Sequence, residues 1–171
     1  FQPIAKRIGW DARPGEGHLD ALLRSTALEQ LGTYEDHEAL EEASARFSRY
    51  LEEPAKVHPD IRRVVFSLAA MRGDRDTYDT MWELQKRATL QEEKIRLLMA
   101  LTDFQQPDFL EETLQRSLTE DVRVHDTISV VTSVASNRHG RDLAWQFLKS
   151  NWAEFDRRYA HGGFGLMRLV S

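Results

Sequence analysis

Cysteine is absent from this chain of 171 residues, and its absence excludes several kinds of site. Without cysteine there can be no disulfide framework, no zinc site built from thiolates and no thiol nucleophile. A chain without disulfides needs no oxidising compartment. We therefore expect a cytoplasmic location.

Long apolar runs and an excess of basic residues are also missing. No run of about 18 apolar residues occurs, and the first residues lack the basic-then-apolar pattern of a signal peptide, so we expect no membrane partner. The formal net charge is −5, from 23 Lys and Arg against 28 Asp and Glu. Nucleic acid is a poor partner for such a surface, because its phosphates are bound by clustered basic residues.

The usual catalytic motifs are missing as well. There is no glycine-flanked serine elbow, and no pair of histidines stands one helical turn apart beside a glutamate, as zinc peptidases require. The nearest approach is His37-Glu38-Ala39-Leu40-Glu41, where Glu41 replaces the second histidine, so we predict a solvated first helical turn. The six histidines form no local ligand pair; they are His18, His37, His58, His125, His139 and His161. We therefore predict no catalytic, metal-binding or cofactor-binding residue in this chain, and no enzymatic activity of its own.

Three further groups of residues could carry chemistry, and for each we favour a structural role. The stretch Pro14-Gly15-Glu16-Gly17 lacks the lysine, the hydroxyl and the preceding strand of a phosphate loop, so we interpret it as a loop before a helix. Adjacent carboxylates on a helix point about 100° apart and are usually solvated; they are Glu41/Glu42, Glu92/Glu93 and Glu111/Glu112. Four aromatic residues are expected to pack between the last helices, with a peptide-binding groove as the alternative: Trp145, Trp152, Phe155 and Tyr159.

Apolar residues at three- and four-residue spacing dominate what the sequence does contain. We expect two such sets to face the core: Ile61, Val64, Val65, Leu68 and Ala69, and Leu19, Leu22, Leu23, Ala27 and Leu31. The β-branched segment 127–134 is ambiguous, but we interpret it as a buried helix because a lone strand would have no partner. The pattern predicts a short amphipathic piece at 4–8 and helices at 17–32, 36–53, 59–72, 75–88, 90–104, 107–119, 122–137, 140–152, 153–160 and 164–170.

Turn residues divide these helices into antiparallel pairs. Gly32 and Gly73 end apolar runs, where a left-handed cap favours glycine, and aspartates follow each of them. Pro59 and Pro107, each followed by an aspartate, are suited to a first helical turn. The pairs begin near residues 17, 59, 90 and 122, and such spacing of roughly 30–40 residues is typical of an α-solenoid. We therefore predict an all-α fold, a HEAT-like or armadillo-like solenoid, with residues 1–171 as a single helical-repeat region.

The stretch from Gly9 to Arg24, GWDARPGEGHLDALLR, resembles the opening of a helical-repeat segment in the C-terminal domain of zinc aminopeptidases. The similarity is closest to the puromycin-sensitive group, whose domain is of the endoplasmic reticulum aminopeptidase C-terminal-like type. Matching segments follow in the same order along the whole chain, among them Ala43-x-x-Arg46-Phe47, Asp60-Ile61-Arg62, Gln91-Glu92-Glu93-Lys94, Val122-Arg123, His139-Gly140-Arg141 and Asn151-Trp152.

This resemblance implies an all-helical bowl that closes over an active site and offers a concave surface to the distal part of a peptide. The enzymes of the family remove N-terminal residues from peptides, with zinc held by two histidines and a glutamate in a separate catalytic domain. Zinc is then expected in the parent enzyme only, and the partners are the catalytic domain of the same polypeptide and the peptide substrate.

We accordingly expect a non-catalytic fragment of a larger C-terminal domain. The alternative is a stand-alone aminopeptidase-like scaffold that binds peptides or proteins. In a fragment, apolar residues near both ends should be exposed or buried in a crystal or dimer contact, among them Phe164, Leu166, Met167 and Leu169.

Four charged residues lie beside apolar helical positions within the matching segments: Arg24, Arg62, Arg123 and Asp126. A buried charge persists only when it is paired and hydrogen-bonded. We therefore predict that at least one Arg–Asp pair joins neighbouring helix pairs, formed from Arg24, Asp60, Arg62 and Asp126.

Overall fold

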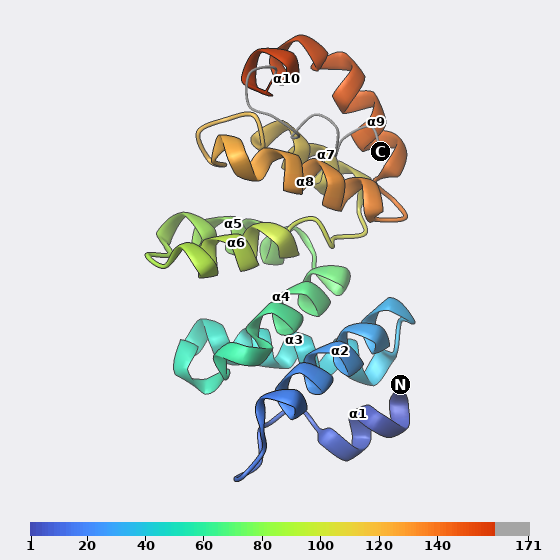
Figure 1. Ribbon diagram of the computed structural model, residues 1–171, viewed down its shortest axis with the longest axis vertical. Coiled ribbons are helices and arrows are strands. Elements are labelled where there is room, and N and C mark those ends of the chain that lie inside the picture. The colour runs from blue at the N-terminus through green and yellow to red at the C-terminus, as the bar shows by residue number, and fades with distance from the viewer. Residues whose placement is uncertain (160–171) are drawn as a thin grey trace.

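The computed structural model describes residues 1–159, and these residues form helices without any strand (Figure 1). In chain order the helices are α1 (Gln2–Ile8), α2 (His18–Thr33), α3 (His37–Glu52), η1 (Pro54–Lys56, a 3₁₀ turn), α4 (Pro59–Arg72), α5 (Arg75–Arg87), α6 (Gln91–Ala100), α7 (Pro107–Arg116), α8 (Val124–Ser136), α9 (Arg141–Ser150) and α10 (Trp152–Tyr159). The prediction of an all-α fold is confirmed. The expected helix 164–170 and the expected exposure of Phe164, Leu166, Met167 and Leu169 lie outside the described residues.

The helices follow one another along the long axis of the molecule. In Figure 1 the colour changes steadily from blue at α1 to red at α10. Helices α2, α4, α6 and α8 form one row, in which each packs on the next, and α3, α5 and α7 each pack against the following helix of that row. Packing between near neighbours in the chain agrees with the expected solenoid of helix pairs.

The helix starts have local causes. Asp36 precedes α3 and its Oδ1 accepts a hydrogen bond from the backbone N–H of Ala39 at 3.0 Å, and Asp74 caps α5 through Thr77 N–H at 2.9 Å. Pro59 begins α4 and Pro107 begins α7, where the missing N–H costs no helical hydrogen bond. The segment 127–134, which could have been a strand, lies inside α8.

The two glycines do not have the predicted left-handed conformation. Gly32 lies within the last turn of α2, and Gly73 has φ −64°. In the connection between α2 and α3, the residue with the left-handed conformation is Glu35, at φ 56°. Both glycines instead allow close packing. A Cβ on Gly32 would lie 1.9 Å from Leu68 Cδ2, and one on Gly73 would lie 2.5 Å from Phe104 Cε1.

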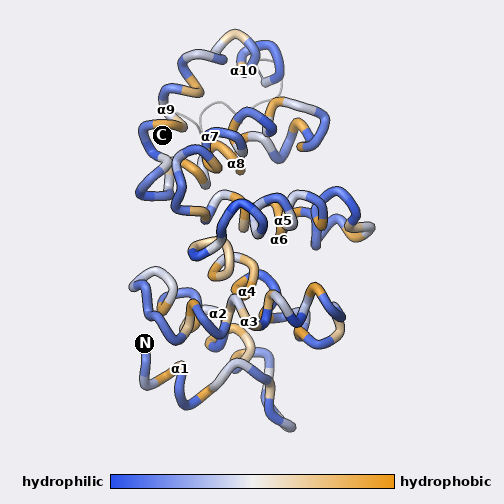
Figure 2. The backbone as a smooth tube through the Cα atoms, turned by 180° about the vertical axis from the view of Figure 1, so that it is seen from behind, coloured by the Kyte–Doolittle hydropathy of each residue, from blue (hydrophilic) through white to orange (hydrophobic). Residues whose placement is uncertain are grey.

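Helix α4 occupies the middle of the core. Figure 2 shows pale and orange colours through α4, flanked by bluer segments. The predicted core set on this helix is confirmed, because Ile61, Val64, Val65, Leu68 and Ala69 are all buried. Packing of α2 and α3 on one side of α4 and of α6 on the other explains why this helix is apolar around most of its circumference.

The predicted orientation of α2 is wrong for its N-terminal half. Leu19, Leu22 and Leu23 are 79%, 52% and 38% exposed, whereas Arg24, Ala27 and Leu28 are buried. Apolar residues surround this helix on several sides, so their spacing does not define one inward face. The contacts with α1 and α4 select the face that carries Arg24 and Leu28.

Candidate functional site

The histidine-containing stretch at the start of α3 is exposed. His37 Nδ1 lies 3.4 Å from Glu41 Oε2, and both side chains are open to solvent. Across residues 1–159 no three His, Cys, Asp or Glu side chains come close enough together to hold a metal ion. The residues described do not fit a zinc site.

The other histidines of the described part are also exposed, and His58 has a structural role. Its Nδ1 accepts a hydrogen bond from the N–H of Asp60 at 3.3 Å, at the start of α4. His18, His125 and His139 are exposed at separate places in the fold, and His161 lies outside the described residues.

Each of the three adjacent pairs of carboxylates has at least one member in an ion pair. Glu42 pairs with Arg46 at 2.8 Å, and Glu112 pairs with Arg75 at 2.8 Å. Glu92 forms an ion pair with Arg96 on the same helix. Ion pairs at helix surfaces stabilise the fold only weakly.

Glu93 differs from the others because it is buried. Tyr50 Oη donates to Glu93 Oε1 at 2.6 Å, Arg96 Nη1 donates to Oε2 at 3.1 Å, and Arg62 Nη1 lies 3.4 Å from Oε1. Burial, together with the adjacent Glu93 carboxylate, raises the pKa of Tyr50. The cluster joins α3, α4 and α6, and all its charged groups have partners, which indicates a structural role.

The predicted Arg–Asp pair is wrong in its partners. Arg62 pairs with Glu93, while Asp60 and Asp126 have no arginine within ion-pair distance among residues 1–159. The contact from Arg62 nevertheless joins neighbouring helix pairs, from α4 to α6. Both aspartate and glutamate can form an ion pair with an arginine, and the sequence alone does not identify which acidic residue lies near it.

The opening stretch is held in place by the buried side chain of Arg24. Its guanidinium donates to Gly9 O at 3.0 Å and to Ile8 O at 3.4 Å, and it forms an ion pair with Glu16. Asp11 accepts two hydrogen bonds of 2.7 Å from Arg46 of α3. These contacts fix the loop to α2 and α3.

The four aromatic residues near the end of the described part divide into two groups. Phe155 and Tyr159 are buried. Phe155 packs edge-on against Phe147 of α9 with ring centroids 6.1 Å apart, and Tyr159 Oη donates to Val124 O of α8, which confirms the expected packing for these two. Trp145 and Trp152 are 53% and 45% exposed. The packing prediction is therefore wrong for the tryptophans.

The structure contains a polar hollow that was not predicted from the sequence, which we name the Asp103 hollow. Its volume is about 310 Å³, and it is lined by Gly32, Thr33, Glu35, Met71, Asp103, Gln105, Ser133, Ser136, Asn137, Arg138 and His139. Asp103 Oδ2 accepts a hydrogen bond of 2.6 Å from Ser67 Oγ. Burial raises the pKa of Asp103 to about 6, partly opposed by the Ser67 hydrogen bond, and Glu29 raises it further.

The rim of the hollow joins parts of the chain that are far apart in sequence. Arg138 forms an ion pair with Glu35, 103 positions away, and its Nε donates to His139 Nε2 at 2.9 Å. The only sequence signal for the hollow is that Asp103 stands between the apolar run 97–101 and Phe104. Nothing in that spacing indicates which turns lie beside it.

None of the helices within residues 1–159 is long and apolar enough to cross a membrane.

The comparison with protein families agrees with this fold. The family model described as "ERAP1-like C-terminal domain" matches residues 1–171. Aminopeptidase M1-A of Oryza sativa subsp. japonica is 36% identical over 158 residues, which cover 89% of this chain and 18% of that protein. Aminopeptidase M1 of Arabidopsis thaliana is 31% identical over 176 residues, which cover 100% of this chain and 20% of that protein. Aminopeptidase N of Homo sapiens is 31% identical over 136 residues, which cover 78% of this chain and 14% of that protein.

The chain thus spans about a fifth of the length of these relatives or less. Their names agree with the resemblance to aminopeptidases and do not test the narrower similarity to the puromycin-sensitive group. The match over all 171 residues and the helical fold lead to one conclusion: this chain belongs to the ERAP1-like C-terminal domain family.

Proposed function

We propose that this chain is the non-catalytic helical part of a zinc-dependent aminopeptidase and shapes the chamber through which peptides reach the active site. The observation that carries the proposal is the family match along residues 1–171. The fold supports it, because a solenoid offers an extended surface for a peptide. The described residues also contain no cluster suited to a metal ion.

The same proposal extends to the intact protein. The catalytic domain of the same polypeptide would hold the zinc, and the substrate would be a peptide that loses its N-terminal residue. Residues 1–171 would form a single helical-repeat region within a larger domain. We place the protein in the cytoplasm, which a cysteine-free chain permits.

The first test is the intact gene product. We expect its sequence to contain two histidines one helical turn apart with a glutamate beside the first, and the purified protein to contain zinc. The chain of 171 residues alone should not hydrolyse chromogenic aminoacyl amides, with or without added zinc. An intact product without a zinc motif would instead support a stand-alone peptide-binding scaffold, and turnover by the isolated chain would reveal an unrecognised site.

The second test concerns selection of peptides. In the intact protein, residues 1–171 are exchanged for the matching segment of Aminopeptidase M1 from Arabidopsis thaliana. We expect kcat/KM for a single aminoacyl amide to stay the same and the preference for peptide length to move toward that of the donor. An unchanged length preference would contradict a role in the chamber.

A further inference from the structure

The Asp103 hollow lies where the C-terminal ends of several helices meet. Its lining comes from the last turn of α2 and the residues after it, from the end of α4, from the connection after α6, and from the end of α8 and the turn that follows. The C-terminal end of a helix carries a partial negative charge, because its last carbonyl groups have no helical partner. Several such ends around one hollow favour a positive charge inside it.

The Asp103 carboxylate adds a full negative charge when ionised. It accepts one hydrogen bond, from Ser67 Oγ to Oδ2, and no donor reaches Oδ1 among residues 1–159. No lysine, arginine or histidine of these residues lies within ion-pair distance of it. Asp103 is half-buried, and a carboxylate held partly out of water without a paired cation is costly.

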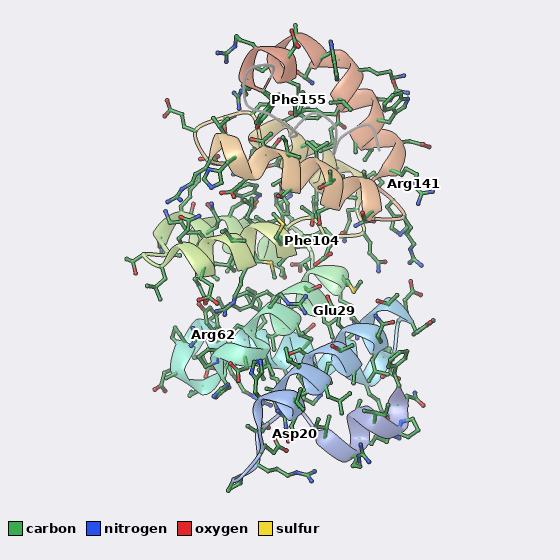
Figure 3. The ribbon with its side chains drawn as sticks, viewed as in Figure 1. Asp20, Glu29, Arg62, Phe104, Arg141 and Phe155 are labelled. Atoms are coloured by element: carbon green, nitrogen blue, oxygen red, sulfur yellow. The ribbon has the colours of Figure 1, made fainter. Side chains whose placement is uncertain are left out.

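The charged groups nearest to Asp103 are already paired. On the α2 and α4 side, Glu29 accepts hydrogen bonds of 2.6 and 2.9 Å from Arg63. On the rim, Glu35 pairs with Arg138, which also contacts His139. Figure 3 labels Glu29 of α2 and Phe104, the neighbour of Asp103 in sequence, in the middle of the molecule.

We propose that the Asp103 hollow binds the ammonium or guanidinium group of a lysine or arginine side chain. A volume of about 310 Å³ lies at the lower end of the range for ligand pockets, which suits a single side chain. The inference stands on the hollow itself and does not depend on the proposed function. A bound cation would supply the partner that Asp103 lacks, and the helix ends around it would reinforce the attraction.

Titration of Asp103 provides an independent readout. Its pKa of about 6 in the free protein should fall when a cation binds, and binding should weaken as the pH is lowered through that value. The other charged or titratable groups that face the hollow or Asp103 are Glu29 from α2, Arg63 from α4, Glu35 from the connection between α2 and α3, and Arg138 and His139 from the turn after α8. Measuring binding by the His139→Gln variant at the same pH values separates the contribution of His139 to the pH dependence.

The test is a titration of the ¹⁵N-labelled chain with Nα-acetyl-lysine amide and Nα-acetyl-arginine amide, followed by NMR. For ligands of this size we expect dissociation constants of about 1–10 mM. Saturable shifts should appear at the backbone amides of Gly32, Gln105 and Asn137. Nα-acetyl-norleucine amide, which has a similar length without the charge, should produce no saturable shift at these positions.

The decisive variant is Asp103→Asn, which keeps the size of the side chain and an acceptor for Ser67. We expect it to weaken binding of the cationic probes by at least about tenfold. Asp142→Asn, at an exposed position of α9, is the matched control and should bind like the unchanged chain. Equal binding by Asp103→Asn, equal shifts with the norleucine probe, or no saturable shift at the hollow would each overturn the proposal, as would identical shifts from potassium chloride alone.

Discussion

Replacing Asp103 by asparagine should stabilise the folded chain at neutral pH. Burial raises the pKa of Asp103 from 3.8 to about 6, so the folded state favours the protonated acid. The resulting stabilisation of the folded state is fully present below the pKa of Asp103 in the unfolded chain, and it is lost as the pH rises through about 6. A difference of about two units corresponds to roughly 3 kcal/mol, so Asp103→Asn should gain about 2–3 kcal/mol at neutral pH and little at about pH 4.

Urea unfolding followed by circular dichroism measures this difference. The free energies of unfolding of the variant and the unchanged chain are compared at several pH values from about 4 to 7.5. Taking the difference removes the titration of all other groups, provided that the urea dependence of both proteins has the same slope.

Asp142→Asn serves as the control here too, because this side chain is exposed in α9 and should give a smaller difference from the unchanged chain at neutral pH than Asp103→Asn. The reasoning is refuted if Asp103→Asn is destabilising at neutral pH, or if its effect does not grow between about pH 4 and 7.

Three further predictions concern packing and the buried polar groups. Gly32→Ala should lower the free energy of unfolding by about 1–3 kcal/mol, since the added Cβ would overlap Leu68; a thermal melt that matches the unchanged chain would contradict this. Glu93→Ala should cost about 3–5 kcal/mol in urea unfolding, because two arginines lose their buried carboxylate, and a loss below about 1 kcal/mol would show that the cluster is solvated. Arg24→Met should speed cleavage after Glu16 by a glutamate-specific endoprotease, because the opening loop loses its contacts with Arg24; an unchanged rate of cleavage would mean that the remaining contacts suffice.

The helices could be predicted well from the sequence because their signals are local. The predicted range 59–72 coincides with α4, and the predicted 36–53 differs from α3 by one residue at each end. Aspartate caps, first-turn prolines and apolar spacing all act within a few residues of the helix that they define. Glycine was less informative, because Gly32 serves the approach of Leu68 from another helix rather than a turn of its own.

The candidate site could not be predicted, since its members come from turns that are far apart in the sequence. Asp103, Glu35 and Arg138 are brought together only by the stacking of the helix pairs. The same limit affected Arg62, whose partner is Glu93 rather than an aspartate. Pairing of charges depends on distances between helices, which a single sequence does not contain.

The sequence by itself determined the helical class, the ends of most helices, the lack of a zinc motif and the resemblance to aminopeptidases. These follow from composition, from local spacing and from segments that match in order. Only the tertiary structure decided which face of α2 is buried, which left Leu19 exposed and Arg24 inside, and which turns surround Asp103. The physical reason is that burial depends on what the neighbouring helices cover, and contacts between helices that are separate in the sequence decide this.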